Sequence, residues 1–388
     1  MTRKILVVDD EPDLEALILQ KFRRKIRSSE FEFFFARNGL EALAKLQNHE
    51  DIDMVLTDIN MPEMDGLTLL EELLKLPTLT KAVVVSAYGD MNNIRTAMNR
   101  GAFDFVTKPI DFRDLEVTID KTLGELKALR DGRRASDTLN ALQQEMELAG
   151  RLQQSILPKS YPVREEISLF TKMVPAKDIG GDFFDYFLID EDHLGIAIAD
   201  VSGKGVTAAM FMAVSRTLLR FTALQGLDVV AVLAHVNNLL CIDNEMSMFV
   251  TVFYGILDMQ TGEFRYANGG HFPAIKLSQN RTVEFLPRTR GIALGVMEGI
   301  EFEEGSVRLA PGDLLYLFTD GIVEAENTKS EFFEEKRLMD FLRGQLEEIT
   351  PEKVVTGAQK FVEEFAGDAE QFDDMTQLAL QYRPVNNR

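Results

Sequence analysis

Apolar and polar positions alternate in a regular order over residues 1–122. Short apolar runs are separated by stretches in which apolar residues recur at helical spacing, as at Leu67, Leu70 and Leu74. This order predicts an α/β fold in which five parallel strands form a doubly wound sheet with short loops. The five strand candidates are Ile5–Val8, Phe31–Phe35, Met54–Thr57, Ala82–Val85 and Phe103–Thr107.

Residues 123–158 follow the pattern of one amphipathic helix. Apolar residues recur there at intervals of 3, 4 and 3, and the next follows after 7. This short heptad seam predicts a helical, coiled-coil linker through which two copies of the chain form a homodimer, although a single helix packed on its own domain fits the same pattern. Pro158 ends the helix. The seam consists of Leu139, Leu142, Met146, Ala149 and Ile156.

Residues 160–383 mix strand and helix patterns, and they predict a layered α+β domain. We therefore expect three parts: residues 1–122, a linker at 123–158, and residues 160–383. The strand candidates in the last part are Leu194–Ala199, Phe249–Leu257, Phe264–Ala267, Leu314–Thr319 and Met375–Gln381. The helix candidates are Val206–Gln225, Asp228–Asp243, Glu335–Leu346 and Pro351–Phe365.

Composition narrows the class of protein. Of 388 residues, 42 are Lys or Arg and 63 are Asp or Glu, and the net charge of −21 argues against a broad nucleic-acid interface. The single cysteine, Cys241, excludes an intramolecular disulfide and a multi-thiolate zinc site. The chain has no apolar run of membrane-spanning length, and no basic-then-apolar leader at its start. We expect a soluble, cytoplasmic protein that binds neither nucleic acid nor membrane.

Three aspartates are expected at one edge of the first sheet. Asp9 and Asp10 follow the first apolar run and Asp58 follows the third, and parallel strands end at the same edge. Carboxylates crowded together favour a hard cation such as Mg²⁺. Ser86 and Lys108, at the ends of the fourth and fifth runs, add a hydroxyl and an ammonium. This set is suited to phosphorylation of Asp58, because Lys108 and the metal neutralise phosphoryl oxygens while Ser86 donates a hydrogen bond.

The motifs VVDDEP, TDINMPEMDG, SAYGD and TKP resemble the response-regulator receiver domain over about 120 residues. The resemblance implies that a cognate histidine kinase phosphorylates Asp58. Phe105 occupies the aromatic switch position, where many members carry Tyr, and a cis peptide bond is expected between Lys108 and Pro109. The Mg²⁺ ligands that the resemblance implies are Asp9 or Asp10, Asp58 and the backbone carbonyl of Asn60.

Four further acidic motifs lie in residues 160–383: GGD at 180–182, ADVSG at 199–203, FTDG at 318–321 and DDMT at 373–376. Three of them adjoin an apolar run, and no His or Cys lies beside them. Such a set of hard oxygen ligands favours Mg²⁺ or Mn²⁺ over Zn²⁺. Two such ions, about 3.5–4 Å apart, can support in-line displacement at phosphorus. Aspartates in ordinary tight turns are the alternative for any one motif.

These motifs resemble the PPM (PP2C-like) serine/threonine phosphatases. The match is to the bacterial branch of sporulation and stress-response regulators, and the matching stretches, in order, are VPAKDIGGDFFDY, IADVSGKGVTAAM, YANGGHFPA, LFTDGIVEA and DDMT. The resemblance implies an αββα sandwich with two Mn²⁺ or Mg²⁺ ions. The arginine that grips phosphate in eukaryotic relatives has no evident counterpart. The implied metal ligands are Asp182, Asp200, the backbone carbonyl of Val201, Asp320 and Asp373, with Asp374 as a secondary candidate.

Two other sites are rejected on their spacing. SGKG at 202–205 lacks the glycine and the Ser or Thr of a P-loop, and Cys241 lacks the arginine that a cysteine-dependent phosphatase needs. His271 is interpreted as a hydrogen-bonding residue that shapes its loop. The sequence thus predicts a response regulator whose output is a phosphoserine/phosphothreonine protein phosphatase, acting on an anti-sigma-factor antagonist (STAS-type) protein. The alternative is a catalytically weak scaffold that sequesters a signalling partner when it is phosphorylated.

Overall fold

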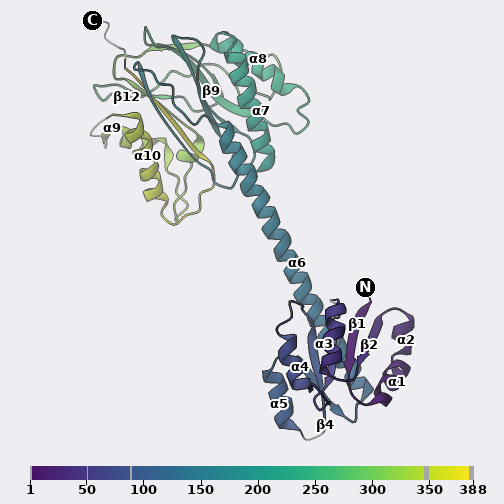
Figure 1. Cartoon of the computed structure of the whole chain (residues 1–388). Helices are drawn as coiled ribbons and strands as arrows, with labels where there is room; N and C mark the ends of the chain where they lie inside the picture. Colours follow the sequence, from purple (N-terminus) through teal and green to yellow (C-terminus); the bar gives the residue numbers. More distant parts are fainter. Residues whose placement is uncertain (1, 50, 88–89, 345–348, 384–388) are drawn as a thin grey trace. The chain divides into compact units, whose positions relative to one another are not determined.

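The computed structural model describes residues 2–49, 51–87, 90–344 and 349–383. The chain divides into two compact units, Met1–Ala141 and Leu142–Arg388, and Figure 1 traces their elements. In the first unit, five parallel strands form a sheet in the order β2-β1-β3-β4-β5, which confirms the predicted doubly wound fold. The strands are β1 (Arg3–Val8), β2 (Phe31–Ala36), β3 (Met54–Asp58), β4 (Lys81–Ala87) and β5 (Asp104–Lys108).

Apolar clusters cover both faces of this sheet. Ile5, Val7 and Leu56 belong to one cluster, whereas Leu6 and Val55 belong to the other. Because successive side chains of a strand point to opposite faces, a strand buried on both sides reads as an uninterrupted apolar run. The helices between the strands are α1 (Pro12–Lys21), α2 (Arg23–Arg27), α3 (Gly39–Asn48), α4 (Gly66–Leu73) and α5 (Met91–Asn99).

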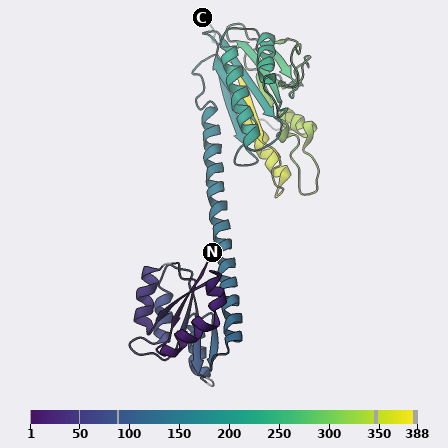
Figure 2. The same cartoon turned by 90° about the vertical axis from the view of Figure 1, so that its right-hand side faces the viewer.

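The next helix, α6 (Phe112–Ile156), is 45 residues long and unbroken, as Figure 2 also shows. It begins upstream of the predicted linker, residues 123–158, because no proline breaks the helix between residues 112 and 123. Its first turns bury Leu115 and Ile119 in the receiver core, and its last turns bury Gln153. Among the described residues, no helix is long and apolar enough to cross a membrane.

The second unit is a sandwich of two antiparallel sheets between two pairs of helices, which confirms the predicted αββα architecture. One sheet has the order β13-β10-β9-β8-β7 and the other β12-β11-β14-β15-β6. The strands are β6 (Ile167–Val174), β7 (Phe183–Leu188), β8 (His193–Val201), β9 (Val250–Asp258), β10 (Glu263–Gly269), β11 (Ile275–Leu277), β12 (Val283–Phe285), β13 (Gly305–Arg308), β14 (Leu314–Phe318) and β15 (Met375–Tyr382). The helices are α7 (Val206–Ala223), α8 (Val229–Cys241), α9 (Glu334–Gly344) and α10 (Pro351–Ala366).

Alternating side chains of one strand serve two different cores of this sandwich. Leu315 and Leu317 of β14 pack between the sheets, together with residues of α7 and α8. Leu314 and Tyr316 of the same strand pack outward against α9 and α10. The ends of β8 and β14 therefore carry the acidic motifs on a backbone that is fixed by packing on both faces.

Candidate functional sites

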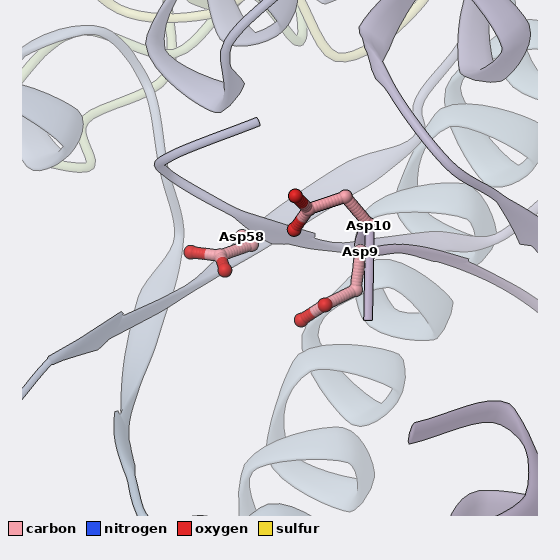
Figure 3. A group of neighbouring side chains, drawn as sticks. All are labelled: Asp9, Asp10 and Asp58. Atoms are coloured by element: carbon pink, nitrogen blue, oxygen red, sulfur yellow. The ribbon is translucent and has the colours of Figure 1, made fainter. Parts of the chain in front are cut away.

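The first acidic site lies at the carboxyl edge of the receiver sheet. One carboxylate oxygen from each of Asp9, Asp10 and Asp58 lies within 4.8 Å of the other two, and Figure 3 shows the side chains together. Asp58 is the last residue of β3, and Asp9 and Asp10 directly follow β1. Asp9 and Asp58 are buried, whereas Asp10 is exposed. Three carboxylates at this separation fit a hard divalent cation.

Lys108 is the cation of this site. Its Nζ lies 2.7 Å from Oδ2 of Asp58, 3.1 Å from Oδ2 of Asp9 and 3.1 Å from Oε1 of Glu11. Burial alone would lower the pKa of Lys108, but its hydrogen bonds to Asp58 and Asp9 outweigh burial and raise that pKa. The ammonium is therefore charged where a phosphoryl group on Asp58 would need neutralising.

The other predicted receiver residues surround these carboxylates in different ways. The buried Oγ of Ser86 has no hydrogen-bond partner among the described residues, so it can donate to a phosphoryl oxygen. Asn60 and Phe105 are exposed. The peptide bond between Lys108 and Pro109 is cis, as expected. Tyr88 and Gly89, in the motif SAYGD, lie outside the described residues.

The second acidic site gathers aspartates from four places in the sandwich. Asp182 precedes β7, Asp200 lies near the end of β8, Asp320 follows β14, and Asp373 precedes β15. Within the described part of the chain, their oxygens do not form a group as tight as that of the receiver. They nevertheless interact strongly through their charges.

The electrostatics of this site fit a bound cation. Burial, followed by the charges of Asp200 and Asp374, raises the pKa of Asp182 well above its ordinary value. Burial and the charge of Asp320 raise the pKa of Asp200 to about 7. Burial, together with Glu324 and Asp373, raises the pKa of Asp320 to about 6. Buried carboxylates that disfavour one another's charge are stabilised by divalent cations, and hard oxygen ligands suit Mg²⁺ or Mn²⁺.

The two adjacent aspartates of the DDMT motif have different environments. The carboxylate of Asp374 accepts hydrogen bonds from the backbone N–H groups of Ala176 at 2.9 Å and Gly181 at 2.7 Å. These bonds fix the loop that carries Asp182. Asp373 is half-buried and faces Lys204, whose Nζ lies 3.1 Å from its Oδ2. Both carboxylate oxygens of Asp374 are thus engaged by backbone N–H groups, whereas the carboxylate of Asp373 is paired with an ammonium.

Two polar residues outside the predicted ligand set support this site. The hydroxyl of Thr319 donates to Oδ2 of Asp182 at 2.7 Å and accepts from the N–H of Thr376 at 3.0 Å. Gln153 of α6 binds the backbone of Gly180, next to the site. Thr319 lies inside the FTDG motif, so the sequence does contain a signal for it. Gln153 lies in the stretch ELAGRLQQSILP, which resembles the helix before this domain in the family, but its bond to Gly180, 27 residues later, has no local signal.

A buried ion pair fixes α7 on the strand that follows Asp182. Asp185 of β7 is fully buried, and its oxygens lie 3.0 Å from Arg216 and 2.9 Å from Arg220, both of α7. Burial raises the pKa of Asp185, and the two arginines oppose that rise. Because removal of one partner would leave an unpaired buried charge, this cluster stabilises the placement of α7.

His271 joins β9, which pairs with the strand that carries Asp200, to β14, which leads to Asp320. Its Nε2 donates to the carbonyl of Phe318 at 3.1 Å, so its Nδ1 accepts from the hydroxyl of Thr251 at 2.9 Å. Thr251 pairs with Asp200 across β8 and β9. Burial lowers the pKa of His271 to about 4, and the imidazole is neutral at physiological pH.

Comparisons with known proteins agree with this geometry. A family model described as "Stage II sporulation protein E (SpoIIE)" matches residues 190–383, which is half of the chain, and one described as "Response regulator receiver domain" matches residues 5–120. Among solved structures, the SiaA-PP2C domain of Pseudomonas aeruginosa has a TM-score of 0.56 at 23% identity, covering 63% of this chain and 98% of that one. This similarity supports the fold of the second unit.

Two curated relatives match more than half of the chain. Protein IcfG of Synechocystis sp. is 32% identical over 271 residues, which cover 63% of this chain and 42% of IcfG. Phosphoserine phosphatase RsbU of Bacillus subtilis is 28% identical over 276 residues, which cover 70% of this chain and 79% of RsbU. The matched region is therefore less than half of IcfG and most of RsbU.

Proposed function

The chain belongs to the SpoIIE family and carries a response-regulator receiver domain before its phosphatase domain, and on this premise we propose that it is a metal-dependent phosphoserine/phosphothreonine protein phosphatase controlled by phosphorylation of Asp58. The observation that carries the proposal is the gathering of Asp182, which is buried, with Asp200 and Asp320, which are half-buried, at the ends of the sandwich strands, where burial and neighbouring carboxylates raise their pKa values. Such a cluster is unfavourable by itself, and bound cations would relieve it.

Two divalent cations would be held by the implied ligands of the phosphatase domain. When bound, they supply Lewis acidity and positive charge at the phosphoryl group. The protein's own part is to hold the carboxylates in place: Thr319 orients Asp182 through its hydroxyl, and Asp374 fixes the preceding loop through two backbone N–H groups. The ligand set we propose is Asp182, Asp200, the carbonyl of Val201, Asp320 and Asp373.

The receiver would control this activity through Asp58. A carboxylate oxygen of Asp58 attacks the phosphorus of a phosphohistidine on a cognate kinase, so that an O–P bond forms while the N–P bond to the histidine breaks. Lys108 and the unpaired hydroxyl of Ser86 are placed to bind the transferred oxygens. Asp9, Asp10, Asp58 and the carbonyl of Asn60 are the proposed Mg²⁺ ligands, and Phe105 is the proposed switch residue.

We further propose that α6 joins two chains. Leu139, Leu142 and Met146 of the predicted seam are 62%, 53% and 40% exposed in the single chain, although apolar side chains of this size are usually buried. A second α6 would bury them as in a coiled coil. The substrate we propose, a phosphorylated STAS-type protein, follows from the resemblance to the sporulation and stress-response phosphatases.

The proposed activity is tested by a phosphatase assay of the purified full chain. With Mn²⁺ or Mg²⁺ it should hydrolyse p-nitrophenyl phosphate and release phosphate from phosphorylated STAS-type proteins, at a rate that changes when beryllofluoride occupies Asp58. If neither metal supports turnover, with or without beryllofluoride, the proposed phosphatase activity is refuted. Tight, metal-independent binding of a partner without turnover would instead support the scaffold.

A further inference from the structure

The C-terminal end of α6 binds the loop that carries Asp182. Gln153, which is 6% exposed, donates from its Nε2 to the carbonyl of Gly180 and accepts the N–H of Gly180 on its Oε1 at 3.1 Å. A single amide side chain therefore satisfies both backbone groups of Gly180, which lies two residues before Asp182. Buried backbone groups need such partners, and the loss of a partner is costly.

A second contact brings the backbone of α6 against the same loop. A Cβ atom added at Gly150 would lie 2.1 Å from the carbonyl oxygen of Asp178, so only glycine permits this approach. Gly150 lies within α6, where alanine would favour the helix by about 1 kcal/mol. The helix thus contains an intrinsically unfavourable residue at the point where it touches the loop.

The loop is held from the opposite side by Asp374. Its Oδ2 accepts the N–H of Gly181 at 2.7 Å and that of Asp182 at 3.4 Å. Gly180 is bound by the helix and Gly181 by the strand-end carboxylate, and the side chain of Asp182 is 1% exposed. The position of the Asp182 carboxylate therefore depends on both attachments.

We propose that Gln153 is a positioning residue, which fixes the Asp182 loop through Gly180 and makes metal binding depend on the last turns of α6 being packed against the phosphatase unit. The inference deepens the proposed function and rests on it, since it names how that site is regulated. The same helix begins at Phe112 in the receiver unit. A receiver signal that unwinds or withdraws the final turns of α6 would release the loop and lower activity.

The experiment compares Gln153→Ala with the control Gln154→Ala in the full chain, because Gln154 is the exposed neighbour on the same helix. Hydrogen exchange of the backbone in residues 176–182 should quicken at least tenfold in Gln153→Ala and stay unchanged in the control. The Mn²⁺ dissociation constant, measured by calorimetry, should rise about tenfold in Gln153→Ala alone. Gln153→Glu, which places a carboxylate oxygen against the carbonyl of Gly180, should weaken Mn²⁺ binding at least as much as Gln153→Ala.

A second pair of variants keeps the inference testable if Gln153→Ala fails to fold. Gly150→Ala should weaken Mn²⁺ binding and quicken exchange of the same loop even though alanine favours the helix. Gly132→Ala is the matched control, because a Cβ atom there meets nothing within 4 Å. If Gln153→Ala and Gly150→Ala both leave loop exchange and Mn²⁺ affinity at the values of their controls, or if they change only the melting temperature, the inference is wrong.

The outcomes separate this inference from the proposed function. If the wild-type chain turns over phosphate but Gln153→Ala matches Gln154→Ala in exchange and in Mn²⁺ affinity, the phosphatase stands and Gln153 has no positioning role. If the wild type shows no turnover while Gln153→Ala loses loop protection and Mn²⁺ affinity, the positioning role stands and the enzyme assignment fails.

Discussion

The strongest pH prediction concerns His271, whose neutral imidazole joins Thr251 to Phe318. Its pKa is about 4 in the folded protein and 6.5 ordinarily. Between these values the unfolded chain takes up a proton that the folded chain does not, so stability falls as the pH falls. At about 1.36 kcal/mol per pKa unit, the full loss is about 3 kcal/mol, and about 2 kcal/mol of it occurs between pH 7.5 and pH 5.

The aspartates of the same domain titrate in this range too, and a variant is needed to isolate His271. His271→Gln keeps a donor for Phe318 and an acceptor for Thr251 but does not titrate. Urea unfolding can be followed by tyrosine fluorescence, since the chain has no Trp and six of its 7 Tyr residues lie beyond residue 160. The stability difference between wild type and His271→Gln should shift by about 2 kcal/mol between pH 7.5 and pH 5, to the disadvantage of the wild type. A difference that stays constant with pH would refute the neutral, bridging imidazole.

Three further predictions address the two sites and the buried ion pair. Asp200→Asn should lower Mn²⁺-dependent hydrolysis of p-nitrophenyl phosphate at least a hundredfold, and an unchanged rate would exclude Asp200 as a ligand. Without metal it should raise the melting temperature, because it removes a half-buried carboxylate repelled by its neighbours. Asp58→Asn should abolish labelling by acetyl phosphate, seen by mass spectrometry, whereas labelling elsewhere would contradict the receiver assignment. Asp185→Ala should cost about 3–5 kcal/mol in urea unfolding, because it leaves Arg216 and Arg220 unpaired; a loss below about 1 kcal/mol would show that the cluster does not stabilise α7.

Some elements could be predicted from the sequence because their signal is local. The apolar run Leu314–Thr319 corresponds to β14, which ends at Phe318, since a strand buried on both faces needs apolar residues at every position. β7 has no such uninterrupted run, because Asp185 interrupts it. That charge is balanced by arginines of α7, which the local sequence does not contain. The short strands β11, β12 and β13 have only three or four residues each, and their pairing comes from neighbouring strands.

The sequence by itself determined the order of the five receiver strands, most of the longer strands and the helices of the second unit, the two sets of aspartates and the hard-oxygen chemistry that they favour. These features are carried by periodicity and by residues adjacent to strand ends, which are properties of short segments. Only the tertiary structure decided that Asp374 binds backbone amides while Asp373 pairs with Lys204, that His271 bridges two strands, and that Gln153 holds Gly180. Each of these depends on hydrogen bonds between segments distant in sequence, which sheet packing brings together and which no local pattern encodes.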